Sequence, residues 1–250
     1  MGFLWQEIHK STKAIMQPKI GIKSSANLGV SANGAEAFTI KFFIRYLKEF
    51  NYQVDIVGAE FLPKELIPDN HYSYFRINHL PRILRSLLHI PISILSVFIY
   101  CFRHKPDLLF ITGGVFYNGL AIYLCGKLFG IKVVVRTAED HFNFYKYTST
   151  LTAKIHHFFV NRFISSFILR NANYVLTTGI KSKQFFIENG SNPSGTYGIP
   201  GYIEKEKFKK SQNNFRKENS IPEDKILVLY VGAISGVKGA NFLKDIIYEV

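Results

Sequence analysis

Two acidic residues and a histidine follow one predicted buried strand. They lie in the segment Arg136–His141 (RTAEDH), directly after an apolar run. A carboxylate or an imidazole at this place could accept a proton from a hydroxyl group, so Glu139, Asp140 and His141 are catalytic candidates. The alternative is a local role, in which an acidic side chain pairs with Arg136 and Asp140 caps a helix. We favour the chemical interpretation, and the sequence leaves both open.

Two glycine-containing loops follow other predicted strands. The first, Gly29–Glu36, contains Gly34, and the second begins with Gly113 and Gly114. Glycine lets backbone N–H groups come close to a phosphate, and a following helix N-terminus adds partial positive charge. Neither loop has a Walker A or a complete G-x-G-x-x-G pattern. The alternatives are an ordinary flexible loop for the first and tight strand-to-helix packing for the second.

A third glycine-rich segment carries a positive charge as well. Gly232–Gly239 (GAISGVKG) follows the apolar run ILVLYV and precedes a predicted helix. Lys238 would supply the charge, while Gly239 and the helix N-terminus would supply N–H donors. This combination favours a diphosphate-binding turn.

The elements that must position these segments alternate between strand and helix. Strands are predicted at Lys19–Ser25, Tyr52–Gly58, Asp107–Thr112, Lys132–Arg136 and Tyr174–Thr178, and helices at Ala37–Phe50, Ile83–His104, Asn118–Phe129, Thr150–Asn171 and Lys181–Asn189. Phe61–Asn78 is predicted to be irregular, and Ile199–Gly201 to form a turn or a short strand. This alternation predicts a doubly wound α/β domain with a parallel sheet. Ligands bind at the carboxyl ends of the strands in such a sheet, where these loops lie.

Changes in composition suggest the domain organisation. Residues 1–18 are predicted to form an amphipathic helix, and residues 19–203 a Rossmann-like domain. Residues 204–224 form a charged linker, and residues 225–250 open a second α/β unit with a strand at Ile226–Val231 and a helix from about Ala240. One strand and one helix cannot bury a core, so we expect the start of a larger domain. The alternative is that they dock on the first domain as its last unit.

The charge balance points to an anionic partner. The 250 residues include 31 Lys and Arg against 18 Asp and Glu, a formal charge of +13. From His71 to Ile187 there are fourteen basic residues and three acidic ones. Phosphate-bearing substrates, an anionic membrane or nucleic acid would match this charge, and a lysine bias that aids solubility is the alternative. The basic residues are not clustered in one run and no nucleic-acid motif occurs, so we expect no nucleic-acid partner.

Neither a metal site nor a disulfide framework is expected. Cys101 and Cys125 lie in apolar segments, which is typical of core residues in a reducing compartment. The eight histidines are scattered, without the spacing of metal ligands. We therefore expect a cytoplasmic protein without a metal.

Two segments bear on membrane contact. Ile83–Phe102 is about long enough to span a bilayer, but Arg85, His89 and Pro91 interrupt it, which favours a core-facing or surface-lying helix. Lys154–Arg170 alternates basic and aromatic residues and could lie in an anionic interface. A core helix is the alternative for that segment.

Six segments occur in an order that resembles a known family. LVLYVGAISGVKGANFLKDII resembles an apolar strand, G-R-L-x-x-x-K-G and a helix, and NGAEAFTIKFFIRYLKEFNYQVDIVG resembles a first loop, helix and second strand. KPDLLFITGG, GIKVVVRTAED, ANYVLTTGIKSKQFFIENG and YGIPGYIEKEKF resemble the later segments. The family is that of the retaining family-four glycosyltransferases of the GT-B fold. Each motif is loose, but their order and spacing over residues 19–250 make the resemblance specific.

The resemblance implies a function and a division of labour between domains. A sugar would pass from a nucleotide diphosphate sugar to an acceptor with retained configuration and without a further cofactor. The acceptor would bind mainly to the first domain, near Arg136, Gly113 and Gly114. The donor would bind mainly to the second domain.

The resemblance also assigns donor-side and catalytic positions. Lys238 would contact the donor diphosphate, with Gly232 at the turn of close approach, and Gly34 would face the donor from the first domain. Glu139 falls about where many members have a histidine that aids the acceptor hydroxyl, and His141 lies two residues further on.

Several departures separate this sequence from the family pattern. Ala233 stands where the family has an arginine, and Gly201 and Tyr202 stand where Asn-Gly is usual. The family's paired glutamates, which hold the donor ribose, would fall after residue 250. Residues 1–17 have no family counterpart.

We therefore expect a glycosyltransferase that uses a nucleotide sugar and a lipid-linked or polysaccharide acceptor. It would be cytoplasmic and peripheral on the inner face of the cell membrane. The alternative is a truncated or degenerate glycosyltransferase-like binding domain without activity of its own, which Ala233 and the absent ribose segment favour.

Overall fold

The computed structural model describes residues 17–24, 35–58, 62, 67–75, 79, 81–112, 115, 117–137, 140, 142–147, 150–200 and 214–227. The chain divides into two compact units, Met1–Tyr202 and Ile203–Val250. In the second unit a short helix, α8 (Phe215–Glu218), is followed by a turn that Arg216 holds by donating to the carbonyl oxygens of Pro222 and Lys225. The predicted helix from about Ala240 and all but the first two residues of the predicted strand Ile226–Val231 lie outside the described residues, so the boundaries of the second domain remain predictions.

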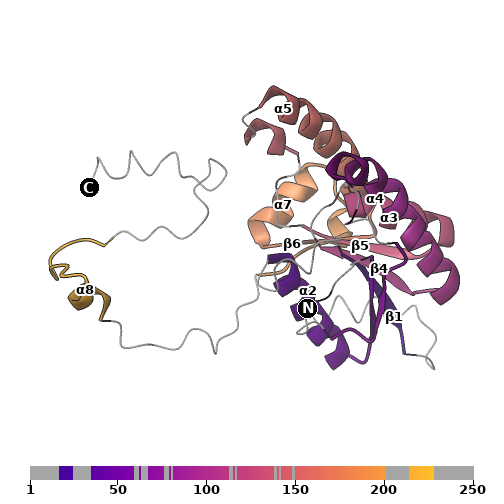
Figure 1. The fold of residues 1–250 in the computed structure, drawn as a ribbon, viewed down its shortest axis with the longest axis horizontal. Helices are drawn as coiled ribbons and strands as arrows, with labels where there is room; N and C mark the ends of the chain where they lie inside the picture. Colours follow the sequence, from indigo (N-terminus) through magenta and orange to yellow (C-terminus); the bar gives the residue numbers. More distant parts are fainter. Residues whose placement is uncertain are drawn as a thin grey trace. The chain divides into compact units, whose positions relative to one another are not determined.

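Seven parallel strands form the sheet of the first unit (Figure 1). They are β1 (Lys19–Lys23), β2 (Gln53–Val57), β3 (Asn70–Tyr72), β4 (Leu108–Thr112), β5 (Lys132–Arg136), β6 (Tyr174–Thr177) and β7 (Thr196–Gly198). Their order is β3-β2-β1-β4-β5-β6-β7, and every neighbouring pair is parallel. The predicted doubly wound α/β fold is confirmed. The strand order reverses between β1 and β4, which is the switch point of the sheet.

Helices cover both faces of this sheet (Figure 1). The helical segments are α2 (Ala35–Glu49), α3 (Arg82–His104), α4 (Tyr117–Phe129), η2 (Phe144–Tyr147), α5 (Leu151–His157), η3 (Phe158–Ser165), α6 (Ser166–Asn171), α7 (Ile180–Glu188) and η4 (Pro193–Gly195). Helix α2 packs on one face, and α3, α4, α6 and α7 contribute to the core on the other. Two layers of helices therefore bury the central strands on both sides.

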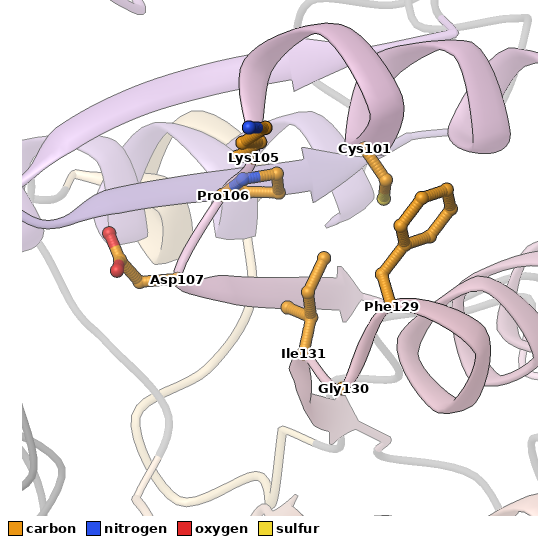
Figure 2. Close-up of a pocket in the computed structure, with 7 residues that line it drawn as sticks. All are labelled: Cys101, Lys105, Pro106, Asp107, Phe129, Gly130 and Ile131. Atoms are coloured by element: carbon orange, nitrogen blue, oxygen red, sulfur yellow. The ribbon is translucent and has the colours of Figure 1, made fainter.

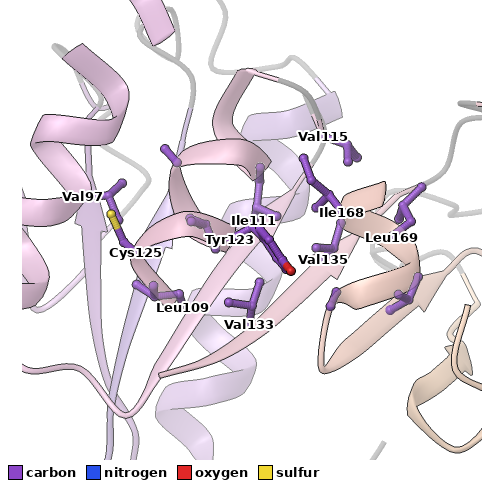
Figure 3. Close-up of a cluster of buried hydrophobic side chains, with 14 of the residues drawn as sticks. Val97, Leu109, Ile111, Val115, Tyr123, Cys125, Val133, Val135, Ile168 and Leu169 are labelled. Carbon is purple, nitrogen blue, oxygen red and sulfur yellow. The ribbon is translucent and has the colours of Figure 1, made fainter. Parts of the chain in front are cut away.

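The central strand β4 shows why continuous apolar runs form this sheet. All five of its residues are buried, with Leu108 and Phe110 on the α2 face and Leu109 and Ile111 on the opposite face. Figure 3 shows Leu109 and Ile111 in the cluster with side chains from α3, α4, β5 and α6. Successive strand residues point to opposite faces, so a strand covered on both sides must be apolar throughout.

A buried polar contact attaches α3 to three strands. The Tyr100 ring lies against the backbone of Gly21 on β1, and its hydroxyl donates to the Asp55 carboxylate on β2 over 2.9 Å. Asn70 on β3 donates to the other oxygen of that carboxylate over 2.8 Å. Tyr100 and Asp55 are fully buried. Burial, followed by the charge of Asp55, raises the pKa of Tyr100, so the phenol remains a donor.

Three elements differ from the sequence prediction. Strand β3 lies in the stretch predicted to be irregular, and β7 comes just before the predicted turn at residues 199–201. Both strands have only three residues, too few to show a hydrophobic period. The predicted helix over residues 150–171 is helical, but its middle, η3, is a π-helix. Hydrophobic spacing alone does not distinguish these two helix types.

The long helix α3 is amphipathic across its 23 residues. It buries Val97, Tyr100 and Cys101 and exposes Leu95 and Phe102. Within the part of the chain that the structure describes, no helix combines the length and apolar character needed to cross a bilayer. The predicted core-facing interpretation of this segment therefore fits the contacts of α3.

The close approach of Tyr100 to β1 predicts the effect of a single methyl group. A Cβ at position 21 would lie 2.4 Å from Tyr100 Cε1, so Gly21→Ala should lower the free energy of unfolding by about 1–3 kcal/mol. Gly119→Ala on α4 is the matched control, because the nearest atom to its new Cβ would be 3.6 Å away and alanine favours a helix. Urea unfolding of both variants measures the difference. Equal stability of the two variants would contradict the proposed packing.

Candidate functional site

The carboxyl edge of the parallel sheet gathers polar residues from several strands. Lys23 ends β1, Thr112 ends β4, Arg136 ends β5 and Thr177 ends β6. Thr112 and Arg136 are register partners on neighbouring strands. Because the strands run in one direction, these side chains lie along the edge where open α/β sheets bind ligands.

Arg136 is the described member of the predicted acceptor-side loop residues. Its guanidinium lies over the ring of Phe43 on α2, with 6.0 Å from Cζ to the ring centroid. Burial lowers the pKa of Arg136. The aromatic face holds the planar cation at the end of β5, where it is available to an anionic ligand.

The Asp140 carboxylate accepts hydrogen bonds from its own loop. One carboxylate oxygen accepts from the backbone N–H groups of Phe142 and Asn143, and the other accepts from the Asn143 side chain, all at 3.0–3.1 Å. The carboxylate makes no ion pair with Arg136, since the two ion pairs among the described residues are Arg45–Glu49 and Lys48–Asp69. This is the local capping role that the sequence left open, and it precedes the short helix η2.

Asp107, another of the three acidic residues between His71 and Ile187, also binds backbone. Its carboxylate accepts from the N–H of Lys19 over 2.7 Å, at the start of β1. Asp69 does the same for Val54 at the start of β2, over 2.7 Å. The scarcity of acidic residues therefore does not by itself mark a catalytic group, because these described ones satisfy backbone donors.

The remaining predicted site residues lie outside the described residues. They are Glu139, His141, Gly34, Gly113, Gly114, Gly232, Lys238 and Gly239. Their roles remain predictions. Of the ten residues predicted for the site, the structure thus places Arg136 and Asp140, on β5 and in the loop that follows it.

A small polar pocket at the carboxyl edge was not predicted from the sequence. It lies beside the ends of β1 and β2, and its lining includes Lys23, Gly58, Phe75, His89, Ser93 and Ser96. Lys23 and Ser93 are both 4% exposed. In the sequence, the signal for this pocket is the lysine that ends the apolar run KIGIK. The pocket residues on α3 lie about seventy positions further along the sequence, so the run alone does not identify them.

A larger pocket of about 460 Å³ opens at the opposite, amino edge of the sheet (Figure 2). Cys101 on α3 and Phe129 at the end of α4 face one another across it, and Lys105–Asp107 form one side. Burial raises the pKa of Cys101 to about 12, so its thiol is not a nucleophile near neutral pH. This pocket is away from the carboxyl ends, and its described lining residues include neither Arg136 nor Asp140.

The side chains that could ligate metal ions are dispersed. Among the residues that the structure describes, no group of three His, Cys, Asp or Glu side chains could hold a metal ion. The arrangement at the carboxyl edge offers hydrogen-bond donors and fixed cations, which suit phosphate groups.

Comparisons by sequence found no matching family model and no curated protein with significant similarity. Comparison by structure gave clear matches. Sucrose-phosphate synthase from Thermosynechococcus elongatus matches 94% of this chain and 60% of its own, at 16% identity and a TM-score of 0.66. HepE from Anabaena, solved with UDP-glucose, matches 81% of this chain and 49% of its own, at 16% identity and a TM-score of 0.51.

A provisionally named UDP-N-acetylglucosamine 2-epimerase from Listeria monocytogenes matches 73% of this chain and 45% of its own, at 13% identity and a TM-score of 0.51. The chain thus spans about half to three fifths of the lengths of these proteins. At such identities a structural likeness establishes the fold. The first unit has the Rossmann-like α/β architecture found in GT-B glycosyltransferases and related sugar-nucleotide enzymes.

Proposed function

We propose that this protein is a retaining glycosyltransferase that transfers a sugar from a nucleotide diphosphate sugar to a lipid-linked or polysaccharide acceptor. The observation that carries the proposal is the seven-stranded parallel sheet, matched over 94% of the chain by sucrose-phosphate synthase. The order of the family-like motifs along residues 19–250 supports it independently of the fold. The binding of UDP-glucose by HepE supports a nucleotide-sugar donor.

The donor side of the proposal rests on the segment that resembles the family's G-R-L-x-x-x-K-G motif. Lys238 would neutralise the diphosphate, and Gly232 and Gly239 would let the backbone approach it. Ala233 removes the second cation that family members have, so Lys238 would carry most of the charge compensation. Gly34 would face the donor from the first domain.

The acceptor side would use the loop after β5. Arg136 is held in place over Phe43 and supplies positive charge at the end of that strand. Asp140 is occupied by backbone donors, which leaves Glu139 and His141 as the candidates for proton transfer.

A peripheral membrane contact would fit a lipid-linked acceptor. Residues four apart along α5, η3 and α6 form an exposed apolar stripe, here called the 151–167 stripe: Leu151, Ile155, Phe159, Phe163 and Phe167. In an α-helix, residues four apart advance by about 40° beyond a full turn, so a stripe with this spacing would wind gradually around the helix axis. The wider turn of the π-helix η3 rotates less per residue and compensates for this drift.

The charge around the 151–167 stripe matches an anionic lipid surface. Lys154, Arg162 and Arg170 are exposed on the same helical segment. The sequence from His141 to Ile187 contains no acidic residue. An apolar stripe with only basic charged neighbours is typical of helices that lie in an anionic interface.

The donor assignment predicts a specific loss in Lys238→Ala. The dissociation constant for the donor should rise about tenfold or more, because a charge-assisted contact to the diphosphate is removed. Calorimetric titration with UDP-, GDP- and ADP-sugars identifies the donor in the unmodified protein and then measures this change. Lys127→Ala, an exposed lysine near the end of α4, is the control and should bind normally. Unchanged affinity in Lys238→Ala would remove Lys238 from the donor site.

The catalytic assignment predicts that Glu139→Gln lowers turnover more than donor affinity. Loss of a general base should reduce kcat by about 10²–10⁴-fold while leaving the ground-state diphosphate contacts intact. Steady-state kinetics and donor titration separate the two effects. Glu188→Gln, at an exposed position on α7, is the matched control. Activity equal to that of the control would exclude Glu139 from the mechanism.

The membrane contact predicts that Phe159→Ser combined with Phe163→Ser weakens vesicle binding by at least about tenfold, because two aromatic side chains no longer enter the interface. Sedimentation with vesicles of phosphatidylglycerol and phosphatidylcholine measures it. Phe215→Ser, at another exposed phenylalanine, is the control and should bind as the unmodified protein does. Binding that does not depend on the anionic lipid would contradict the membrane contact.

A further inference from the structure

The small pocket at the ends of β1 and β2 buries a cation beside the switch point of the sheet. Lys23 is the last residue of β1 and is 4% exposed. Its ammonium donates to the carbonyl oxygen of Ser24 over 2.8 Å. A Cβ on Gly58 would lie 2.5 Å from Lys23 Nζ, and Gly58 has a φ of +92°, so the glycine provides the space for this side chain. The position of the cation is therefore built into two strand ends.

Helix α3 supplies the opposite wall of the pocket. His89 and Ser93 are one helical turn apart and both line the pocket. Burial, and then the charge of Lys23, lowers the pKa of His89, which keeps its ring neutral at physiological pH. The imidazole therefore adds no second positive charge beside Lys23.

Ser93 indicates that a ligand atom completes this pocket. Its side-chain oxygen is buried and has no hydrogen-bond partner among the residues that the structure describes. Ser96, one turn further on, donates to the carbonyl oxygen of Ile92 over 2.7 Å and so is satisfied within the helix. A buried hydroxyl without a partner is unfavourable, and a bound group that accepts its hydrogen would remove that cost.

The size and charge of the pocket define the chemistry of such a group. The cavity measures about 20 Å³, enough for one water-sized atom. The lining residues that the structure describes include a lysine and two serines but no carboxylate. A buried cation next to a hydroxyl donor selects an anionic oxygen, as at other phosphate sites.

We propose that the Lys23–Ser93 pocket binds one terminal oxygen of a phosphate group carried by the acceptor. Lys23 would provide the charge and Ser93 a hydrogen bond, and Phe75 and His89 complete the described lining around them. The assignment of the phosphate to the acceptor rests on the proposed function, because the first domain is the acceptor side. The phosphate could belong to a lipid headgroup or to a soluble sugar phosphate, which share this chemistry.

Titration with inorganic phosphate at constant ionic strength, in the absence of a donor sugar, tests the pocket. Calorimetry should show one saturable site in the millimolar range. Lys23→Gln should weaken this binding by at least about tenfold, and Ser93→Ala by several-fold. Ser93→Ala replaces a helical serine with the best helix former, so it remains informative if Lys23→Gln does not fold.

Two controls separate the pocket from general charge attraction. Lys41→Gln removes an exposed lysine from α2, and Ser194→Ala removes the hydroxyl of an exposed serine in η4. Both should bind phosphate like the unmodified protein. An unsaturable isotherm, or equal binding by Ser93→Ala and the unmodified protein, would overturn the proposal.

Competition identifies the source of the phosphate. Glucose 6-phosphate and a short-chain phosphatidic acid are each titrated against bound inorganic phosphate. Stronger competition by glucose 6-phosphate indicates a soluble acceptor, and stronger competition by phosphatidic acid indicates a lipid acceptor. Competition by neither overturns the acceptor assignment. Since no donor is present, a failed titration leaves the transferase proposal standing, and a failed transferase assay leaves the phosphate isotherm unchanged.

Discussion

The hydrogen bond from Tyr100 to Asp55 sets the position of α3 on the sheet. It crosses β1 at Gly21, where the absence of a side chain lets the ring lie on the backbone, and ends at a carboxylate on β2. Asn70 completes the network from β3. A buried carboxylate is costly unless its lone pairs are satisfied, so this network favours the observed register of the helix and these strands. The same placement brings His89 and Ser93 to the end of β1.

The two edges of the sheet carry side chains of opposite charge. At the amino edge, Asp107 and Asp69 accept backbone N–H groups at the starts of β1 and β2. At the carboxyl edge, Lys23 and Arg136 end their strands as cations. Anionic side chains thus satisfy the strand starts, while the strand ends present positive charge. This polarity would favour the proposed binding of phosphate groups at the carboxyl edge.

The sequence predicted the fold because the central strands are buried on both faces. Continuous apolar runs such as Leu108–Ile111 are typical of a doubly covered strand, and the strands and helices alternate around them. Strands β3 and β7 were not predicted because three residues are too few to show a strand pattern. They are strands because they pair with β2 and β6, respectively. Hydrogen bonds within a few residues, such as those of Asp140, were foreseen as an alternative because they depend on local spacing.

The polar pocket could not be predicted in the same way. Lys23 and Ser93 come from a strand and a distant helix, and only the tertiary packing of α3 brings them together. In the sequence, Ser93 lies within a long apolar stretch, where it gives the impression of a tolerated small residue. Its buried and unpartnered hydroxyl becomes visible only once the neighbouring elements are in place.

The length of α3 has a mechanical consequence. Its 23 residues extend about 34 Å, whereas the five-residue strands beneath it extend about 17 Å. The helix leads into β4 at its C-terminal end, so its surplus length projects past the carboxyl edge. The N-terminal part of α3 therefore reaches the carboxyl edge, where His89 and Ser93 line the polar pocket beside the ends of β1 and β2. Substitutions in this N-terminal part of α3 can therefore change the lining of the carboxyl edge while the contacts of Tyr100 with Gly21 and Asp55 stay in place.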